Sequence, residues 1–378
     1  MEAEMIMLRS GLANLPLHGG KAPPWLIAKM TELGKAIFSV MFLEHGVDEI
    51  LKRLSDPFWF QCLSCVLGYD WHSSGTTTVT MGVLKSFLKP HEYGLAVVGG
   101  KGSRSRNTPV EIDRVADSLN IGETRVQELK RISRLTAKVD NAALQDGFQL
   151  YHHTMVIGKK QWAVVQQGMD KINLYARRYH WLSKPSSSLI VEPHTGIVSD
   201  VLREKVLDMC AKQSESCRKT SLDLVKDNPR HLKRVFNNLK DPFQKTLTAS
   251  SNNYNIQILS MPRRIDWDAL QKAYELQPGS YEDFLLIQGI GPAAVRALAL
   301  ISQLMWGASP SWRDPAKFSF AHGGKDGVPY PVNRKLMERS AQFLTDVVQE
   351  AKIGSKDKMN MLKRLSDFIK PVVESESI

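Results

Sequence analysis

Residues 148–169 read FQLYHHTMVIGKKQWAVVQQGM and contain two short runs that favour β-strands. The runs, at 155–157 and 162–165, are rich in β-branched and aromatic residues, and the turn-forming sequence Gly158-Lys159-Lys160 separates them. This pattern predicts an antiparallel β-hairpin. Because helical patterns dominate the rest of the chain, we expect a predominantly helical α+β fold.

The length of the turn sets the predicted pairing of the hairpin. If Ile157 pairs with Gln161, His152 lies opposite Gln166 and His153 lies opposite Val165. Polar side chains would then gather at the open end of the hairpin.

Further elements are expected on both sides of the hairpin. Apolar residues at helical spacing predict helices over 24–46 and 57–67, and Thr108-Pro109 marks the start of a third helix. We also expect a helix over 173–182 and a strand over 188–192.

Three segments follow from these patterns. Residues 1–198 form an N-terminal mixed α/β module that contains the hairpin and the candidate catalytic residues. Residues 199–252 are a basic helical segment and linker, and residues 253–378 form an all-helical C-terminal module.

The positive charge of the chain is concentrated in its middle. The 378 residues carry a formal charge of +11 at pH 7, and residues 151–260 hold 17 basic and nine acidic side chains. A concentrated positive surface attracts phosphate groups, although a basic surface also keeps a protein soluble.

The chain shows no membrane-spanning run and no secretory signal, and its four cysteines suit a reducing compartment. A cytoplasmic protein without a membrane partner is therefore expected.

Residues 280–301, SYEDFLLIQGIGPAAVRALALI, resemble a helix-hairpin-helix motif. Gly289 and Gly291 permit a sharp turn with bare N–H groups, while Ile290 should point inward and join the two helices. The N-terminus of the second helix adds its dipole, so the turn suits a DNA backbone phosphate. The alternative is an αα-hairpin whose glycine turn is only structural. The predicted DNA-binding residues, in the motif and in local basic clusters, are Gln288, Gly289, Ile290, Gly291, Ala293, Arg177, Arg178, Lys101 and Arg104.

Residues able to act as acids, bases or metal ligands gather in the first two hundred positions. Carboxylates at loops and strand ends can hold Mg²⁺ or Mn²⁺, which would activate water for phosphodiester hydrolysis. We expect Asp140, Asp146 and Glu192 to be the ligands. The other candidate catalytic residues are Asp70, His72, Lys138, His152, His153 and Gln166. An aspartate before glycine is also a common turn residue, and buried histidines are as often hydrogen-bonding groups as ligands.

A DNA glycosylase is a rival interpretation of the same hairpin. Helix-hairpin-helix glycosylases place a catalytic aspartate a little beyond the second helix, and Asp314 lies in about that region. Some of these enzymes carry a lysine nucleophile just after the glycine turn, where this chain has Ala293. A lysine-dependent lyase is therefore disfavoured.

Several longer phrases resemble those of domain-of-unknown-function family number 763, which is found mostly in archaea and thermophilic bacteria. The phrases lie at 11–23 (GLANLPLHGGKAP), 54–61 (LSDPFWFQ), 70–75 (DWHSSG), 138–143 (KVDNAA), 151–154 (YHHT) and 163–169 (AVVQQGM). The resemblance covers nearly the whole chain. It implies the coupling of a distinctive N-terminal module to a helix-hairpin-helix segment, and no catalytic residue comes with it.

Together these features predict a DNA-binding protein that acts in DNA processing or repair. The leading hypothesis is a divalent-metal nuclease whose N-terminal module cuts duplex or branched DNA held by the C-terminal module. A non-catalytic DNA-binding scaffold and the glycosylase are the alternatives. Helix-hairpin-helix modules often act in pairs and the chain has one clear copy, so the sequence is also compatible with a homodimer.

Overall fold

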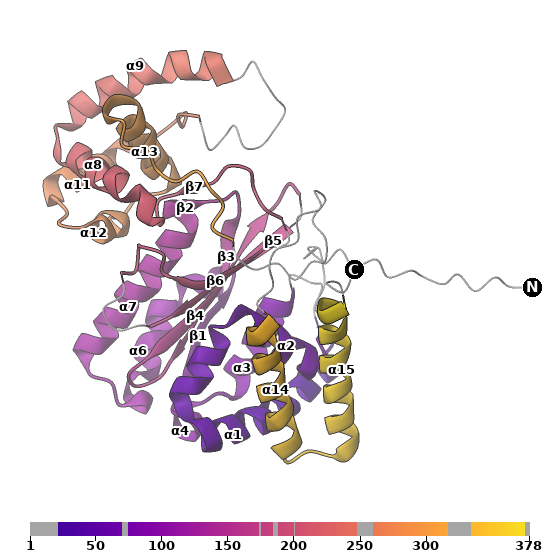
Figure 1. The fold of residues 1–378 in the computed structure, drawn as a ribbon. Coiled ribbons are helices and arrows are strands. Elements are labelled where there is room, and N and C mark those ends of the chain that lie inside the picture. The colour runs from indigo at the N-terminus through magenta and orange to yellow at the C-terminus, as the bar shows by residue number, and fades with distance from the viewer. Residues whose placement is uncertain are drawn as a thin grey trace, which may run out of the picture.

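The computed structural model describes residues 22–69, 75–173, 175–183, 188–199, 201–247, 260–316 and 334–374. Within them, a five-stranded antiparallel sheet has the strand order β1-β3-β4-β5-β6, and two short strands, β2 and β7, pair separately (Figure 1). The strands are β1 (Ala96–Lys101), β2 (Leu144–Gln145), β3 (Gln149–Ile157), β4 (Trp162–Asp170), β5 (Tyr175–Leu182), β6 (His194–Ser199) and β7 (Leu207–Asp208).

Helices account for most of the remaining structure. They are α1 (Pro24–Leu54), α2 (Pro57–Leu67), α3 (Gly75–Phe87), α4 (Pro90–Tyr93), α5 (Ser103–Arg106), α6 (Thr108–Leu119), α7 (Glu123–Lys138), α8 (Glu215–Lys226), α9 (Pro229–Leu247), α11 (Trp267–Leu276), α12 (Tyr281–Leu286), α13 (Pro292–Trp306), α14 (Arg334–Glu350) and α15 (Ser355–Glu374). A π-helical turn, η1 (Val139–Ala143), follows α7, and a 3-10 turn, η2 (Lys212–Ser214), precedes α8. The predominantly helical α+β class predicted from the sequence is confirmed.

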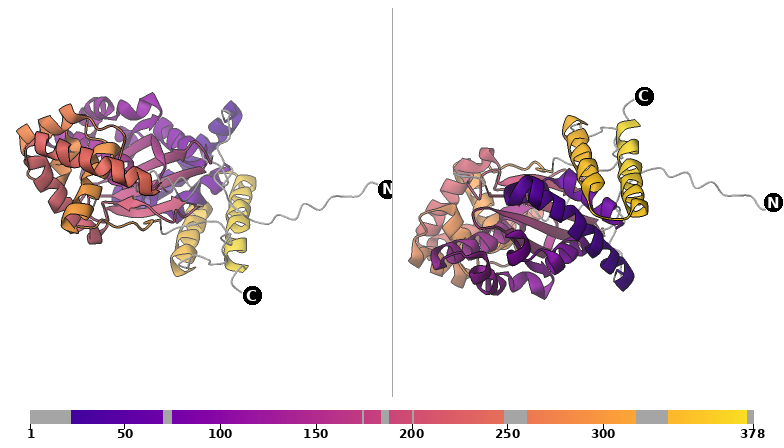
Figure 2. Two further views of the ribbon diagram at one scale, coloured as in Figure 1. Left: turned by 90° about the horizontal axis from the view of Figure 1, so that it is seen from above. Right: turned by 90° about the horizontal axis from the view of Figure 1, so that it is seen from below.

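Two hydrophobic cores cover the two faces of the sheet. One contains Met155, Val164 and Tyr179, lies against α6 and α7, and continues into the helices α8 to α13. The other contains Val156 and Val165 and lies against α1 to α3. Helices α14 and α15 pack on α2 in this second core, so the two ends of the described chain share one core. Figure 2 shows α14 and α15 on the opposite side of the molecule from α8 to α13.

The local predictions for helices are largely confirmed. Helix α2 begins at Pro57 and ends at Leu67, because Asp56 accepts hydrogen bonds from its first amides and Gly68 adopts a left-handed conformation. Helix α6 begins at Thr108 as expected. Helix α1 passes the predicted stop at Gly46, where φ is 75° and the helix kinks.

The predicted hairpin is present as β3 and β4, but its register was wrong by one residue. Ile157 pairs with Trp162, and His153 pairs with Gln166. The amide of Gly158 donates to the carbonyl of Gln161 over 2.9 Å, which closes a four-residue turn instead of a three-residue one. His153 and Gln166 therefore face each other on one side of the sheet.

Two predictions next to the hairpin were wrong. Residues 173–182 were expected to be helical, but 175–182 form strand β5 in the middle of the sheet. Residues 188–192 were expected to be a strand, whereas the strand in this region is β6, which begins at His194. In the parts of the chain that the structure describes, no helix is both long and apolar enough to cross a membrane.

Candidate functional site

The turn between α12 and α13 has the conformation that the sequence predicts. Ser280 caps α12 by accepting a hydrogen bond from the amide of Asp283, and α13 begins at Pro292 after Gly291. Ile290 is fully buried, and its amide donates to the carbonyl of Ile287 over 3.2 Å. Gln288 and Gly289 are exposed on the other side of the turn.

The two glycines of this turn have different roles. Gly289 has φ of 92°, and a β-carbon there would lie 2.6 Å from the β-carbon of Ala269. Gly291 has an extended conformation, with φ of −142°, and a β-carbon there would approach nothing closer than 4.0 Å. The fold therefore needs glycine at 289 but not at 291.

Gly289→Ala is accordingly expected to lower the free energy of unfolding by about 1–3 kcal/mol, because it combines a left-handed backbone with overpacking. Gly291→Ala is expected to have little effect on stability. Chemical denaturation of both variants measures the difference, and equal stabilities would show that the turn is not held in this conformation.

Lys138, at the end of α7, orients the turn from behind. Its Nζ donates a hydrogen bond to the carbonyl oxygen of Ile290. A trans peptide points its C=O and N–H in opposite directions, so the N–H of Gly291 faces away from Lys138. Within the described structure, no group accepts a hydrogen bond from the amides of Gly289 or Gly291. Burial lowers the pKa of Lys138.

The π-helical turn η1 connects this region to the sheet. It follows Lys138 and places Asp140 in the core and Asn141 at the edge of a cavity. Such a turn widens the helix by one residue, so that consecutive side chains leave in directions that a regular helix would not allow.

A cavity of about 320 Å³ lies beside the turn. It is bordered by α13, by the segment that joins β2 to β3, and by the turn after β4. Its lining includes Gln145, Asp146, Phe148, Asp170, Arg203 and Arg296. Gln145 also connects β2 to α13, because its Nε2 donates a hydrogen bond to the carbonyl of Pro292 over 2.8 Å.

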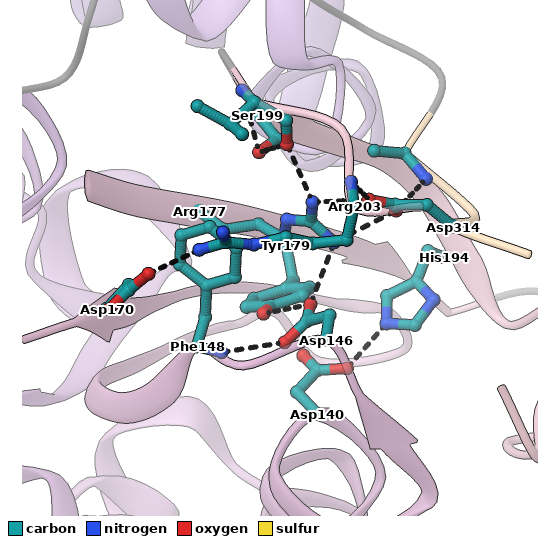
Figure 3. Close-up of polar contacts among 12 residues, drawn as sticks. Asp140, Asp146, Phe148, Asp170, Arg177, Tyr179, His194, Ser199, Arg203 and Asp314 are labelled. Carbon is teal, nitrogen blue, oxygen red and sulfur yellow. Dashed lines mark hydrogen bonds and ion pairs between the residues drawn. The ribbon is translucent and has the colours of Figure 1, made fainter. Parts of the chain in front are cut away.

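Asp146 belongs to a buried ionic network behind the cavity (Figure 3). Arg177 donates to Asp146 over 3.0 Å and to both oxygens of Asp314 over 2.9 and 2.7 Å. Tyr179 donates to Asp146 over 2.7 Å. Burial raises the pKa of Asp146, and Arg177 and Tyr179 oppose that shift. Burial also disfavours the Arg177 cation, but the attraction of the two aspartates outweighs it and raises the pKa of Arg177.

Asp140 belongs to a second buried network. It accepts hydrogen bonds from Gln166 over 2.6 Å and from the indole of Trp181 over 3.0 Å. His194 Nε2 lies 2.5 Å from the other carboxylate oxygen of Asp140 (Figure 3). Gln166 Oε1 lies 2.8 Å from His153 Nδ1. These five side chains thus form one network of hydrogen bonds inside the protein.

Burial disfavours the charged form of His152 and His153, two of the histidines predicted to be catalytic. Because Gln166 uses its amide nitrogen on Asp140, its oxygen accepts from His153 Nδ1, and His153 Nε2 accepts from Ser133 over 2.9 Å. Burial lowers the pKa of His153. Burial, together with the nearby cations, lowers the pKa of His152 to about 3.

The other predicted residues lie apart from these networks. Glu192 is half exposed and pairs with Lys212 over 3.2 Å. Lys101 and Arg104 are exposed at the end of β1 and in α5. Asp70 and His72 lie outside the described residues. Among the positions that are described, no three His, Cys, Asp or Glu side chains form a group able to hold a metal ion.

Arg177 and Arg178 are both buried, although they were predicted to contact DNA. Arg178 donates to Gln61 over 3.1 Å and to His180 over 2.9 Å. Both guanidinium groups are therefore used inside the protein, and neither is at the surface where a phosphate would bind.

Sequence reasoning missed Arg203 and Arg296, which line the cavity. The sequence could have indicated Arg296 as a candidate, because it is the one charged residue of the apolar helix α13. No sequence pattern indicates Arg203, since only the fold brings its segment to Asp170 and Asp314.

Comparisons with curated proteins and with solved structures find no match. A family model described as "Protein of unknown function (DUF763)" matches residues 11–332, which is most of the chain. The protein therefore belongs to the DUF763 family.

Proposed function

We propose that this protein binds DNA through the turn at 288–293, used as a helix-hairpin-helix motif, and that it acts in DNA processing or repair. The observation that carries the proposal is the Gly291 amide, which has no partner in the described structure and faces away from Lys138. The start of α13 adds further free amides and the positive end of the helix dipole. A phosphate oxygen is the acceptor that such a site suits best.

Two basic residues precede the segment that packs on the turn, and their charge favours a phosphate ligand. Asp266 lies against Gly289, and the exposed Arg263 and Arg264 come just before it in the chain. Burial of Ile290 fixes the turn before any ligand arrives, so little ordering is needed on binding. Contacts of this kind hold the sugar-phosphate backbone and do not identify bases.

Salt-dependent DNA binding tests the proposal. Fluorescence anisotropy with labelled single-stranded, duplex and forked oligonucleotides should show binding that weakens about 3.5-fold per phosphate contact when salt rises from about 50 to about 200 mM. Lack of binding to all three oligonucleotides, or binding that ignores salt, would refute it.

Cleavage of the bound DNA by a Mg²⁺- or Mn²⁺-dependent centre stays a prediction. Asp140 and Asp146 belong to separate hydrogen-bond networks and Glu192 pairs with Lys212, so this prediction lacks a shared ligand set. The non-catalytic alternative is favoured by that arrangement. Incubating labelled forked DNA with the protein and either metal separates the two, because only a nuclease leaves shortened strands.

The glycosylase alternative gains no support from the position of Asp314. Its carboxylate binds Arg177 twice and also accepts from the amides of Arg203 and Ala316. A carboxylate with these partners is not free to act on a sugar. A homodimer stays a prediction that light scattering with and without DNA would test.

A further inference from the structure

Arg296 is a cation without a partner at the edge of the cavity. It lies one helical turn after Pro292, and both residues line the cavity. No described group accepts a hydrogen bond from its guanidinium, and its Nε is buried. Burial lowers the pKa of Arg296, with no neighbouring carboxylate to oppose the shift.

The two neighbouring arginines each have a carboxylate partner, which Arg296 lacks in the described structure. Arg177 binds two aspartates, and Arg203 binds Asp170. Arg296 is partly exposed, but its Nε is buried, and a buried donor without an acceptor destabilises a protein because the lost hydration is not replaced. The position of Arg296 is therefore explained by an acceptor that enters the cavity from outside.

The rest of the cavity indicates what kind of group that acceptor belongs to. Among the lining residues the two carboxylates, Asp146 and Asp170, balance the charges of Arg203 and Arg296, so the cavity has no net positive charge to hold a bare phosphate. Phe148 and Leu144 add apolar surface. A neutral, flat group with polar edges suits this mixture of surfaces.

Gln145 supplies a hydrogen-bond acceptor of fixed orientation. Its Nε2 donates to the carbonyls of Ala142 and Pro292 over 3.0 and 2.8 Å, which leaves its Oε1 without a donor in the described structure. The cavity thus offers donors from Arg296 and an acceptor from Gln145, and Asn141 at its rim has no described partner either. A nucleobase with a carbonyl and an amino group can accept hydrogen bonds from Arg296 and donate one to Gln145.

We propose that the cavity receives one unpaired guanine of a DNA strand whose phosphate lies on the 288–293 turn. Arg296 donates to the O6 and N7 acceptors of guanine, as arginine does in other DNA complexes, and the free Oε1 of Gln145 accepts from the N–H groups of the same base. Adenine lacks the carbonyl and thymine lacks the amino group. Cytosine has both, but it has no ring N–H next to its amino group to donate to Gln145. An unpaired base is required because a base inside a duplex is stacked and cannot enter a cavity. This inference rests on the proposed function, since the turn must hold the strand.

Two matched oligonucleotides test it. One is a duplex with a single-guanine bulge, and the other carries an abasic tetrahydrofuran residue at the same position, which keeps the phosphate and removes the base. The full-length protein should bind the guanine bulge at least about tenfold more tightly, as expected for one bidentate arginine contact. An adenine bulge should resemble the abasic one.

Arg296→Met identifies the side chain responsible. The variant should lose the preference for guanine and keep its affinity for the abasic duplex, and its melting temperature should not fall, because no described interaction is removed. Arg114→Met, an exposed position on α6, is the matched control and should keep the preference. Equal binding of both oligonucleotides by the unaltered protein would overturn the inference. So would an equal loss on both with Arg296→Met, which would make Arg296 a phosphate contact. Failure to bind either oligonucleotide would refute the proposed function as well.

Discussion

Arg177→Met is expected to lower the free energy of unfolding by about 3–5 kcal/mol, the cost of leaving buried carboxylates without their partner. Arg177 is fully buried, and Asp146 and Asp314 have side chains only 1% and 4% exposed. Methionine fills a similar volume, so the loss comes from the charges and not from a cavity. Urea denaturation at neutral pH measures it.

Two companion variants separate the ionic effect from a general intolerance of change. Arg203→Met removes one partner of Asp170 at a more exposed position and should cost less than Arg177→Met. Adding Asp146→Asn to Arg177→Met should recover part of the lost stability, because it removes one of the two buried charges. A cost below about 1 kcal/mol for Arg177→Met would mean that the aspartates find other partners.

The second large effect is a loss of stability in acid from buried neutral histidines. Burial lowers the pKa of His152, His153 and His180, so the unfolded chain binds protons below about pH 6.5 that the folded protein does not. Each such histidine costs about 1.4 kcal/mol per pH unit below that point, until its folded pKa is reached. From pH 7 to pH 5 this is about 2 kcal/mol for His152, whose folded pKa is about 3, and His153 and His180 add to the loss in the same direction.

A variant of His180 measures the histidine contribution to acid sensitivity separately. This is needed because other groups, such as Asp208, stabilise the fold as the pH falls. Burial raises the pKa of Asp208 to about 6, which stabilises the fold as the pH falls. His180 Nδ1 donates to the carbonyl of Leu54 over 3.0 Å, and its Nε2 accepts from Arg178 over 2.9 Å. Glutamine can make both bonds without titrating. Relative to the unaltered protein, His180→Gln should therefore gain stability between pH 7 and pH 5, by at most about 2 kcal/mol, and no relative gain would contradict the neutral assignment.

Local sequence patterns predicted most of the secondary structure, and the errors have identifiable causes. Strand β5 was mistaken for a helix because both of its faces are buried, so polar and apolar residues do not alternate along it. Arg177 and Tyr179 contact Asp146 on one face of the sheet, while Arg178 and His180 contact Gln61 and Leu54 on the opposite face. The hairpin register failed because one extra residue in the turn moves every pair.

The sequence predicted only the part of the candidate site whose residues are neighbours in the chain. Gly289, Ile290 and Gly291 are neighbours in sequence, and their spacing alone indicates the turn. The cavity is different, because Asp146, Asp170, Arg203 and Arg296 come from four separate segments. Lys138 was predicted as a catalytic residue, and its contact with Ile290 depends on the packing of α7 near η1 and α13.

The most direct test of phosphate binding by the turn compares Gly291→Val with Gly279→Val. Both glycines lack close neighbours and neither has a left-handed backbone, so both variants should fold normally, as circular dichroism and melting temperature would verify. Valine at 291 covers the free amide, and the loss of hydrogen bonds to a charged group, about 1.5–3 kcal/mol, should weaken binding to a forked oligonucleotide about tenfold to a hundredfold. Valine at 279, at the far end of α12, should leave the affinity unchanged. Equal affinities for the two folded variants would contradict phosphate binding at this turn.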